Sequence, residues 1–517
     1  MSNLSDLIPA GASAKQLTFT DSGSGITTKK PVIVESDGDV TQVAETSTSV
    51  SKGSVDAMIA NQLPTYYSIN GGYDTNVDVH FFGYSEASDY YPKFSCLTLS
   101  GSTLTVQSTT TLASNDNTGA NTICTFHPPT NLVVALTREN MGGVNNFAQA
   151  ITIASGGGSI TTPTRVSMGL SVEHEFYKAV YDEDSGWIVA VSMYNSRPYI
   201  MAYKPSGTGA SATVSFGASS QLFTDTVKHI TLYYDKSQNK IVAGYTDDNQ
   251  SNTFYLHAVS VNSGTGAMTI AARQQMNATA TDWCEIVYDE TAQRGIFAGQ
   301  MTGDYFSLQA IQLNSDDTFT MGALIDDSSF TDSFSGAGAT VVMGVSTNQG
   351  MPIFYHPALQ KTILFYRTQS SSYLGSWPVT CTGSTLTVGT RVDLATTAYS
   401  RSVLGLSYDS DTSYVVIPSN AYYSSAHSLK MQAYRPAYTS TNLTAQAFVG
   451  IADSAISASA AGSVIVQGGT ISGLSSLTTG SNYYVQSDGT FGTSASTPSV
   501  KAGLAISTTS LLLNGDS

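Results

Sequence analysis

The chain has 517 residues, of which 41% are hydrophobic but only 12% are charged. Because an average soluble domain carries about 25% charged residues, Ser, Thr, Gly, Asn and Gln take the place of the missing charge. These residues weaken helices and suit strands and tight turns, and the 29 Tyr and 19 Phe argue against a disordered chain. The composition therefore predicts an all-β fold.

The formal net charge is −16, from 38 acidic and 22 basic residues. A surface with this balance repels phosphate backbones, so we expect no nucleic acid partner. No stretch approaches the ~18 apolar residues of a membrane helix, and the first residues lack the basic and apolar regions of a secretory signal. We therefore expect no membrane insertion, and assembly of the protein in a cytoplasm.

The cysteines are too few for a disulfide framework and lack the C-x-x-C spacing of a zinc site. They are expected to be small buried apolar residues. The four positions are Cys96, Cys124, Cys284 and Cys381.

The first 55 residues contain two predicted strand regions, 16–20 and 31–40, and the second includes Val-Glu-Ser-Asp-Gly. The last 81 residues contain a similar Val-Gln-Ser-Asp-Gly within 483–491. Asp-Gly suits a two-residue type I′ hairpin turn. The two ends share this Ser-Asp-Gly motif and the middle of the chain lacks it, so we predict that the two ends pack together.

Between the two ends, one unit recurs: an apolar strand, Tyr-Asp or a near equivalent, a polar turn and a second apolar strand. The clearest copies are 179–190, 232–243 and 286–297, and two copies carry His-Pro instead of Asp. The steps between copies are 53 to 55 residues, with one step of 67. The second residue of the pair falls at Asp74, His127, Asp182, Asp235, Asp289, His356 and Asp409.

Each repeat has room for four strands, and four strands in about 50 residues are typical of a β-propeller blade. The sequence therefore predicts a seven-bladed β-propeller over residues 56–436. Residues 1–55 and 437–517 are interpreted as the two halves of a small β-barrel or sandwich domain, with the propeller inserted between them. This small domain is the predicted anchor.

The seven Asp and His positions have a local explanation. An Asp carboxylate can accept hydrogen bonds from backbone amides two or three residues further on, which closes the hairpin. A Pro after His presets a turn dihedral instead. We interpret all seven as structural turn residues.

The usual catalytic motifs are missing: the sequence has no G-x-S-x-G elbow, no P-loop and no H-E-x-x-H. The acidic pairs at 247–248 and 326–327 lack the spaced oxygen ligands of a calcium loop. We therefore predict no catalytic residue, no metal and no cofactor, and we expect that the protein is not an enzyme.

Five connections after the second strands of the repeats are rich in Tyr, Ser, Asn and Asp, and they should lie on one face. Adaptable recognition loops use these residues, and a sugar or a protein epitope would fit them. Ordinary polar loops on a Tyr-rich chain are an equally good interpretation. The candidate ligand-binding residues are Tyr90, Tyr91, Tyr194, Arg197, Tyr373, Tyr422 and Tyr423.

The repeated Tyr-Asp unit, followed by Ile/Val-Val-Ala-x-Tyr, resembles the propeller repeats of virion structural proteins from marine tailed bacteriophages. The segments 443–452, 473–480, 483–489 and 502–507 resemble a small C-terminal module of the same proteins, and 31–40 resembles its first part. The resemblance covers nearly the whole chain. It implies a tail fibre, spike, baseplate-associated or capsid-surface protein.

The expected function is therefore host recognition by a virion protein of the tail-fibre or spike type. Its terminal β domain would dock on other virion proteins, and its propeller would bind a host cell-surface glycan or protein. The expected location is the virion, and a homo-oligomer in the particle is left open. Two alternatives stay open: a capsid-surface decoration or cement protein without a ligand, and a polysaccharide depolymerase, which needs two carboxylates ~5–10 Å apart in a cleft.

Overall fold

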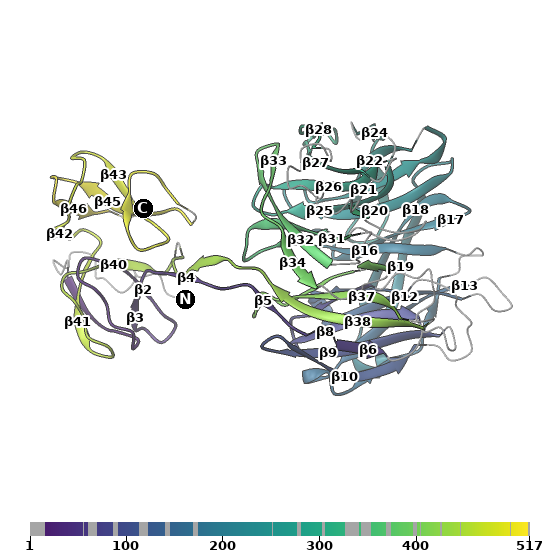
Figure 1. Cartoon of the computed structure of the whole chain (residues 1–517), viewed down its shortest axis with the longest axis horizontal. Coiled ribbons are helices and arrows are strands. Elements are labelled where there is room, and N and C mark those ends of the chain that lie inside the picture. The colour runs from purple at the N-terminus through teal and green to yellow at the C-terminus, as the bar shows by residue number, and fades with distance from the viewer. Residues whose placement is uncertain are drawn as a thin grey trace. The chain divides into compact units, whose positions relative to one another are not determined.

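The chain consists of two compact units, one formed by residues 1–49 and 437–517 and the other by residues 50–436 (Figure 1). The part of the chain described contains strands and short 3-10 turns but no α-helix, which confirms the prediction of an all-β fold. No helix in that part is long and apolar enough to cross a membrane. The computed structural model describes residues 16–54, 56–59, 70–85, 91–112, 122–139, 145–168, 174–250, 252–276, 281–301, 305–325, 341–342, 353–368, 374–395, 401–403, 405–423, 426–444, 446–496 and 498–514.

The described part of the larger unit contains seven antiparallel sheets. The first sheet contains β7 (Asn70–Asp74), β8 (Val79–Ser85), β9 (Pro92–Ser100) and β10 (Thr103–Thr111), and the second contains β11 (Ile123–His127), β12 (Leu132–Glu139), β13 (Asn145–Ile153), β14 (Ile160–Thr161) and β15 (Val166–Ser167). The third sheet contains β16 (Glu175–Asp182), β17 (Trp187–Tyr194), β18 (Arg197–Ser206) and β19 (Thr213–Gln221). The fourth contains β20 (Val227–Asp235), β21 (Lys240–Asp247), β22 (Thr253–Val261), β23 (Met268–Ile270) and β24 (Gln274–Gln275).

The other three sheets complete the larger unit. The fifth sheet contains β25 (Thr281–Asp289), β26 (Arg294–Met301), β27 (Tyr305–Leu313) and β28 (Phe319–Met321). The sixth contains β29 (Val341–Val342), β30 (Ile353–His356), β31 (Lys361–Thr368), β32 (Leu374–Thr382), β33 (Thr385–Val388) and β34 (Val392–Ala395). The last contains β35 (Arg401–Val403), β36 (Ser407–Tyr408), β37 (Val415–Tyr423), β38 (Ala426–Arg435), β5 (Ser51–Lys52) and β6 (Asp56–Ile59).

Neighbouring sheets pack through their first strands. Strand β7 lies beside β11, β11 beside β16, β16 beside β20, β20 beside β25, and β25 beside β30. In the last sheet, β35 lies beside β31 and β36 lies beside β7 of the first sheet. The last sheet therefore contacts both the sixth sheet and the first, which is a β-propeller-like arrangement.

Hydrophobic clusters fill the spaces between the sheets. Among the described residues, seven clusters each join two neighbouring sheets. The cluster between the last and first sheets includes Phe82 and Leu97 on one side and Val416 and Met431 on the other. Because successive side chains of a strand point to opposite faces, each sheet buries apolar side chains on both of its faces.

The last sheet is assembled from both ends of the larger unit. Strands β5 and β6 pair with β38, and Lys52 lies opposite Tyr434 in the register. The predicted boundary at residue 55 is therefore wrong by a few residues: the larger unit begins at residue 50, because β5 already belongs to its last sheet.

The smaller unit contains two five-stranded sheets and a two-stranded one. The first sheet has the order β1-β41-β40-β2-β3, the second has the order β42-β46-β45-β43-β44, and β39 pairs with β4. The strands are β1 (Gln16–Thr20), β2 (Pro31–Val34), β3 (Val40–Gln42), β4 (Glu45–Ser47), β39 (Thr439–Thr441), β40 (Phe448–Ala452), β41 (Ala461–Val466), β42 (Thr470–Ser472), β43 (Asn482–Val485), β44 (Phe491–Gly492), β45 (Val500–Ala505) and β46 (Ser510–Leu513).

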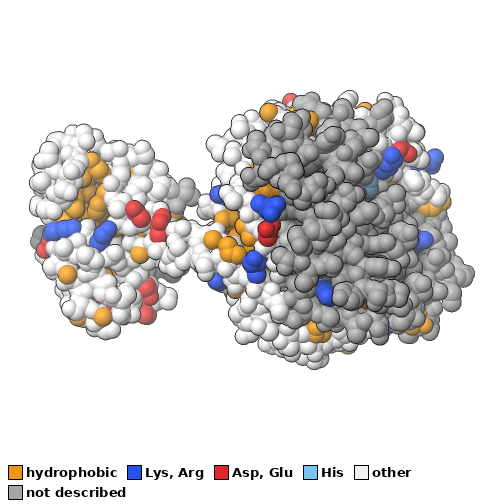
Figure 2. Space-filling model, in the orientation of Figure 1, with side chains coloured by type: hydrophobic (Ala, Val, Ile, Leu, Met, Phe, Trp, Pro, Cys, Tyr) orange, Lys and Arg blue, Asp and Glu red, His pale blue; other side chains and the backbone are white. Residues whose placement is uncertain are grey.

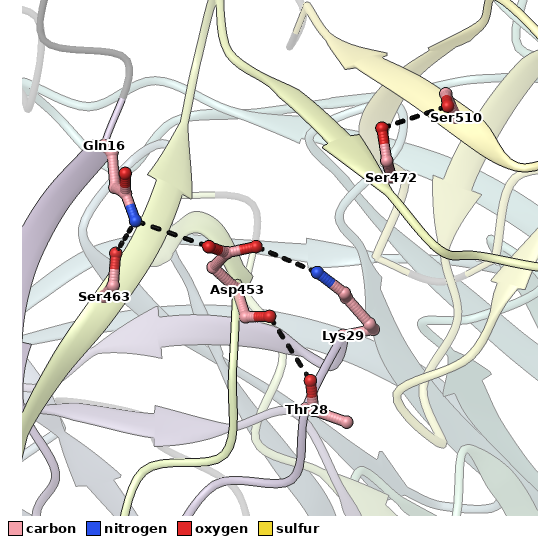
Figure 3. Close-up of polar contacts among 7 residues, drawn as sticks. All are labelled: Gln16, Thr28, Lys29, Asp453, Ser463, Ser472 and Ser510. Carbon is pink, nitrogen blue, oxygen red and sulfur yellow. Dashed lines mark hydrogen bonds and ion pairs between the residues drawn. The ribbon is translucent and has the colours of Figure 1, made fainter.

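The two ends of the chain share the first of these sheets. Strand β2 pairs with β40, and β1 pairs with β41. Figure 3 shows side-chain contacts that cross between the same two segments: Lys29 Nζ lies 2.9 Å from Asp453 Oδ1, and Thr28 Oγ1 donates to the Asp453 carbonyl at 3.3 Å. Exposed ion pairs of this kind contribute little, so the backbone ladders and the buried core hold the two ends together.

The Ser-Asp-Gly connections differ from the predicted two-residue type I′ turn. Five residues separate β2 from β3, and the Glu35 amide donates to the Asp39 carbonyl at 2.8 Å. Of these five residues only Gly38 has a positive φ, of 92°. A type I′ turn needs two consecutive residues at positive φ, so this prediction is wrong, and glycine is needed at one position only.

We predict that residues 437–517 expressed alone lose the first sheet of the smaller unit, because β40 and β41 then lack β2 and β1. Fusing residues 1–49 directly to 437–517 should restore the sheet, since the Thr48 amide already donates to the Tyr438 carbonyl at 2.8 Å. Circular dichroism and protease resistance of the two proteins measure the difference. Equal protease resistance of the isolated segment and the fusion would contradict the prediction.

Candidate functional site

The seven predicted turn residues are all at most 2% exposed. Asp182 Oδ1 accepts the amides of Asp184 and Ser185 at 3.1 and 3.2 Å. Asp235 Oδ1 accepts the amides of Ser237 and Gln238 at 3.0 and 3.2 Å. Asp74, Asp289 and Asp409 accept amides two or three residues on in the same way. These carboxylates close their own hairpins, and burial raises the pKa of Asp182 and Asp235.

The two histidines at this position bond within their own turns and also reach the next sheet, and His127 Nδ1 lies 2.8 Å from Thr130 Oγ1. His356 Nδ1 accepts the Leu359 amide at 3.1 Å, as a carboxylate would, and Nε2 lies 3.1 Å from the Ser413 carbonyl of the last sheet. His127 Nε2 lies 3.2 Å from the Gly186 carbonyl of the third sheet. Burial lowers the pKa of His356 to about 4, so the ring is neutral at neutral pH.

The Tyr of each Tyr-Asp pair reaches back to the turn of the preceding sheet. The Tyr181 ring lies 5.0 Å from the His127 ring, and the Tyr408 ring lies 5.1 Å from the His356 ring. Tyr355 Oη lies 2.7 Å from Thr291 Oγ1 in the fifth turn.

The pKa of each of three further tyrosines is raised, first by burial and also by a carboxylate of the preceding turn. Asp182 acts on Tyr234, Asp235 acts on Tyr288, and Asp409 of the last sheet acts on Tyr73 of the first. The Tyr of the pair is therefore associated with the preceding turn at six of the seven joints between sheets, whereas the second sheet has Phe126 at this position. From the sequence, a role was predicted for the Asp of the pair but not for the Tyr.

A charged pair lies among the first strands of three sheets. Lys178 in β16 forms an ion pair with Glu285 in β25 and donates to the Ile286 carbonyl at 2.8 Å. Thr231 in β20 donates to Glu285 Oε1 at 2.7 Å. The pair connects the third and fifth sheets across the fourth. Sequence reasoning missed it, although a lone Lys in an apolar first strand was a signal.

Two of the predicted ligand-binding residues lie on one tight turn. Tyr194 ends β17, Arg197 begins β18, and the two are paired in the ladder. The residues between them, Asn195 and Ser196, have φ of 47° and 57°, which is typical of a type I′ turn. The predicted recognition loop is therefore a two-residue hairpin turn here. Arg197 is exposed, and the half-buried Tyr194 ring lies 5.7 Å from the ring of His174.

The other predicted residues have different outcomes. Tyr91 is half-buried before β9, with Lys93 Nζ 5.9 Å from its ring. Tyr422 and Tyr423 lie inside β37, opposite His427 and Ala426 of β38, and not in a loop. That prediction is wrong because Tyr favours strands and the ladder continues to the turn. Tyr90 and Tyr373 lie outside the described residues.

The structure reveals a cluster in the fourth sheet that the sequence analysis missed. The Arg273 guanidinium lies 4.0 Å from the Phe223 ring and 4.2 Å from the Tyr255 ring. Arg273 Nη1 lies 3.0 Å from Oδ2 of the buried Asp247, and the Tyr245 ring stacks on Phe223 at 5.4 Å. Arg273 keeps 33% of its side chain exposed. The cluster could not be recognised in the sequence, because its five side chains come from four separate strands and loops.

This cluster is continuous with the Tyr194–Arg197 turn. The Ser196 carbonyl accepts the Val227 amide at 2.6 Å, and Val227 is opposite Asp247 in the ladder. The Leu222 amide donates to the Pro198 carbonyl at 2.9 Å. We call Tyr194, Arg197, Phe223, Tyr255 and Arg273 the aromatic rim. Most of the described surface in Figure 2 is neither charged nor hydrophobic.

The four cysteines are free and buried, as the sequence predicts. Burial raises the pKa of Cys96 to about 12 and that of Cys381 to about 11. All four thiols are therefore protonated at neutral pH, and a thiolate nucleophile is not available.

No family model matches the sequence, and no curated protein matches it. Among solved structures, a protein from Lactobacillus plantarum has a TM-score of 0.43 at 12% identity, over 74% of this chain and 96% of that chain. A putative 6-phosphogluconolactonase from Bacteroides uniformis has a TM-score of 0.41 at 10% identity, over 72% and 98%. AofleA from Arthrobotrys oligospora has a TM-score of 0.39 at 10% identity, over 72% and 99%.

Asp235→Ala should lower the free energy of unfolding by about 1–3 kcal/mol, because the Ser237 and Gln238 amides lose a buried acceptor. Asp316→Ala is the matched control, since Asp316 makes the same kind of turn bond to Thr318 at 3.2 Å but is exposed. Urea denaturation measures both variants. A variant of Asp235 with unchanged stability and lost ligand binding would contradict the structural role.

His174 should make the free energy of unfolding decrease as the pH is lowered. Its side chain is 1% exposed, and burial lowers its pKa to about 4. The folded state holds the neutral ring, whereas the unfolded chain titrates near pH 6.5. This contribution is fully present above about pH 6.5 and is lost as the pH falls toward 4.

Between pH 7 and pH 5 the loss should be about 2 kcal/mol in wild type relative to His174→Gln. The raised pKa values of Asp182 and Asp235 act in the opposite direction, but they are common to both proteins. Urea denaturation at each pH gives the difference. Parallel pH profiles would contradict the prediction.

Proposed function

We propose that residues 50–436 form a seven-bladed β-propeller and that the protein is a host-recognition protein of a tailed bacteriophage virion, of the tail-fibre or spike type. The seven clusters between neighbouring sheets support the propeller, because the cluster of Phe82 and Val416 joins the last sheet to the first. Strand β36 of the last sheet lies beside β7 of the first at the same joint.

The observation that carries the recognition role is the aromatic rim. The Arg273 guanidinium lies close to the Phe223 and Tyr255 rings, and Arg197 is exposed beside Tyr194 on the turn after β17. Aromatic faces stack on the apolar faces of sugars, and guanidinium groups donate to hydroxyl and carboxylate oxygens. A host surface glycan that carries carboxylates fits this chemistry on an otherwise acidic protein of net charge −16.

The construction of the smaller unit supports an anchoring role. Its first sheet needs both ends of the chain, so the larger unit is an insertion within it. An inserted module can present a ligand-binding rim while the smaller unit docks on other virion proteins. The resemblance of both units to virion proteins of marine phages motivates the virion as the location.

The test uses the double variant Tyr194→Ala and Arg197→Ala. Binding energy at an interface concentrates in a few aromatic and Arg residues, so removing two should cost about 2 kcal/mol, or a roughly 30-fold weaker Kd. Binding of the purified protein to an array of bacterial surface polysaccharides measures this, and adsorption of particles carrying the variant confirms it. Arg391→Ala, an exposed Arg paired with Asp393, is the control.

Three outcomes would overturn the proposal. Unchanged adsorption of particles that carry the double variant would favour a decoration or cement protein. Release of reducing sugar from a bound polysaccharide would favour a depolymerase. Antibody label found only on capsid faces would exclude a tail-fibre position.

A further inference from the structure

The first and last sheets of the larger unit meet at a group of three carboxylates. Asp78 ends the β7–β8 turn, and Asp409 and Asp411 lie in the β36–β37 turn. Each offers a carboxylate oxygen, and these oxygens all lie within 4.8 Å of one another. Asp409 is buried and the other two are exposed. Within the part of the chain described, no Lys or Arg forms an ion pair with any of them.

An independent observation concerns His80, which is 1% exposed. Its Nδ1 lies 2.7 Å from Ser407 Oγ, and the Ser407 hydroxyl donates to the Gly72 carbonyl at 2.6 Å. The hydroxyl has one hydrogen, so Nδ1 must carry a proton and donate to Ser407. In the neutral ring Nε2 is then an acceptor, and it is buried without a hydrogen-bond partner.

The unpartnered nitrogen belongs to the same joint as the carboxylates. His80 lies opposite Tyr73 in the ladder with the rings 5.0 Å apart, and the Tyr73 hydroxyl donates to Asp78. Ser407, which holds the other ring nitrogen, is two residues before Asp409. His80 therefore belongs to the same joint between the first and last sheets as the three carboxylates.

The repeats show that an acid at position 78 is a special feature of this joint. The equivalent position, four residues after the turn Asp or His, has positive φ in all seven copies. Asp78 is the only acid among these residues, which are Asp78, Asn131, Gly186, Asn239, Gln293, Gln360 and Ser413. At Asn239 the side chain makes the same bond, accepting from Tyr234 Oη at 3.2 Å. A neutral residue therefore suffices for the turn.

We propose that Ca2+ binds between Asp78, Asp409 and Asp411, that it joins the first and last sheets, and that a water molecule on the ion donates a hydrogen bond to His80 Nε2. Calcium prefers carboxylate and water oxygens in flexible geometry. The ion compensates three like charges, and its water supplies the donor that Nε2 lacks. The site links residues more than 300 positions apart in the sequence, so the bound ion stabilises the contact between the first and last sheets.

The experiment uses the full chain after treatment with chelator. Calorimetric titration with CaCl2 should show one ion per chain, and saturating CaCl2 should raise the Tm by at least about 2 °C, because an ion that binds only the folded state stabilises it by mass action. Asp78→Asn restores the residue type found at Asn131 and Asn239. It should weaken Ca2+ binding at least tenfold, without lowering the Tm of the ion-free protein.

Asp184→Asn is the matched control. Asp184 follows Asp182 at the spacing by which Asp411 follows Asp409, but the facing position is Asn239. This variant should bind Ca2+ as wild type does. Absence of Ca2+ binding by wild type would overturn the proposal, as would equal affinity of Asp78→Asn and wild type. Binding of Mn2+ or Mg2+ without Ca2+ would overturn the choice of ion. The test is independent of host recognition, since it measures neither glycan binding nor adsorption.

Discussion

A sheet that buries apolar side chains on both faces needs a neighbour on each side. This constraint governs the larger unit. Strands β17 and β21 are buried along nearly their whole length, so the third and fourth sheets are stable only between others. The sheets satisfy the requirement by meeting one another in sequence, and the cluster of Phe82 and Val416 satisfies it for the first and last. Apolar packing of this kind is non-directional, so it does not by itself fix the alignment of neighbours.

The Tyr-Asp pair fixes how neighbouring sheets align. The Asp closes its own hairpin with backbone amides, and the Tyr of the next sheet packs against that turn. Asp235 and Tyr288 of the next sheet are both buried. A misaligned neighbour would therefore leave buried polar groups without partners. The pair repeats because nearly every joint between sheets has to be aligned in the same way, although the second sheet has Phe126 in place of the Tyr. At His127 and His356 an imidazole replaces the carboxylate and still reaches the next sheet.

Rigid strand ends are what make the aromatic rim a good candidate for recognition. Tyr194 and Arg197 are held by a two-residue turn, and Arg273 is held between two rings and paired with a buried carboxylate. Side chains that are already ordered lose little entropy on binding. Side chains are also positioned before any ligand binds at the joint between the first and last sheets. There β5 and β6 complete the last sheet, and three carboxylates lie close together.

The sequence by itself determined the all-β class, the period of the repeat, the turn role of residues such as Asp182, and the burial of the four cysteines. These features depend on local chemistry: strand propensity, amides within three residues of a carboxylate, and apolar character. It missed the five-residue connection at Gly38 and placed Tyr422 in a loop, because turn length depends on how far the ladder continues.

Only the tertiary structure decided which distant side chains meet. Lys178 and Glu285, Arg273 and Asp247, and Asp78 and Asp409 come together because neighbouring sheets bring them into register, and no local pattern records that register. A side chain's chemistry is legible in the sequence, whereas its partner depends on the packing of elements far apart in the chain.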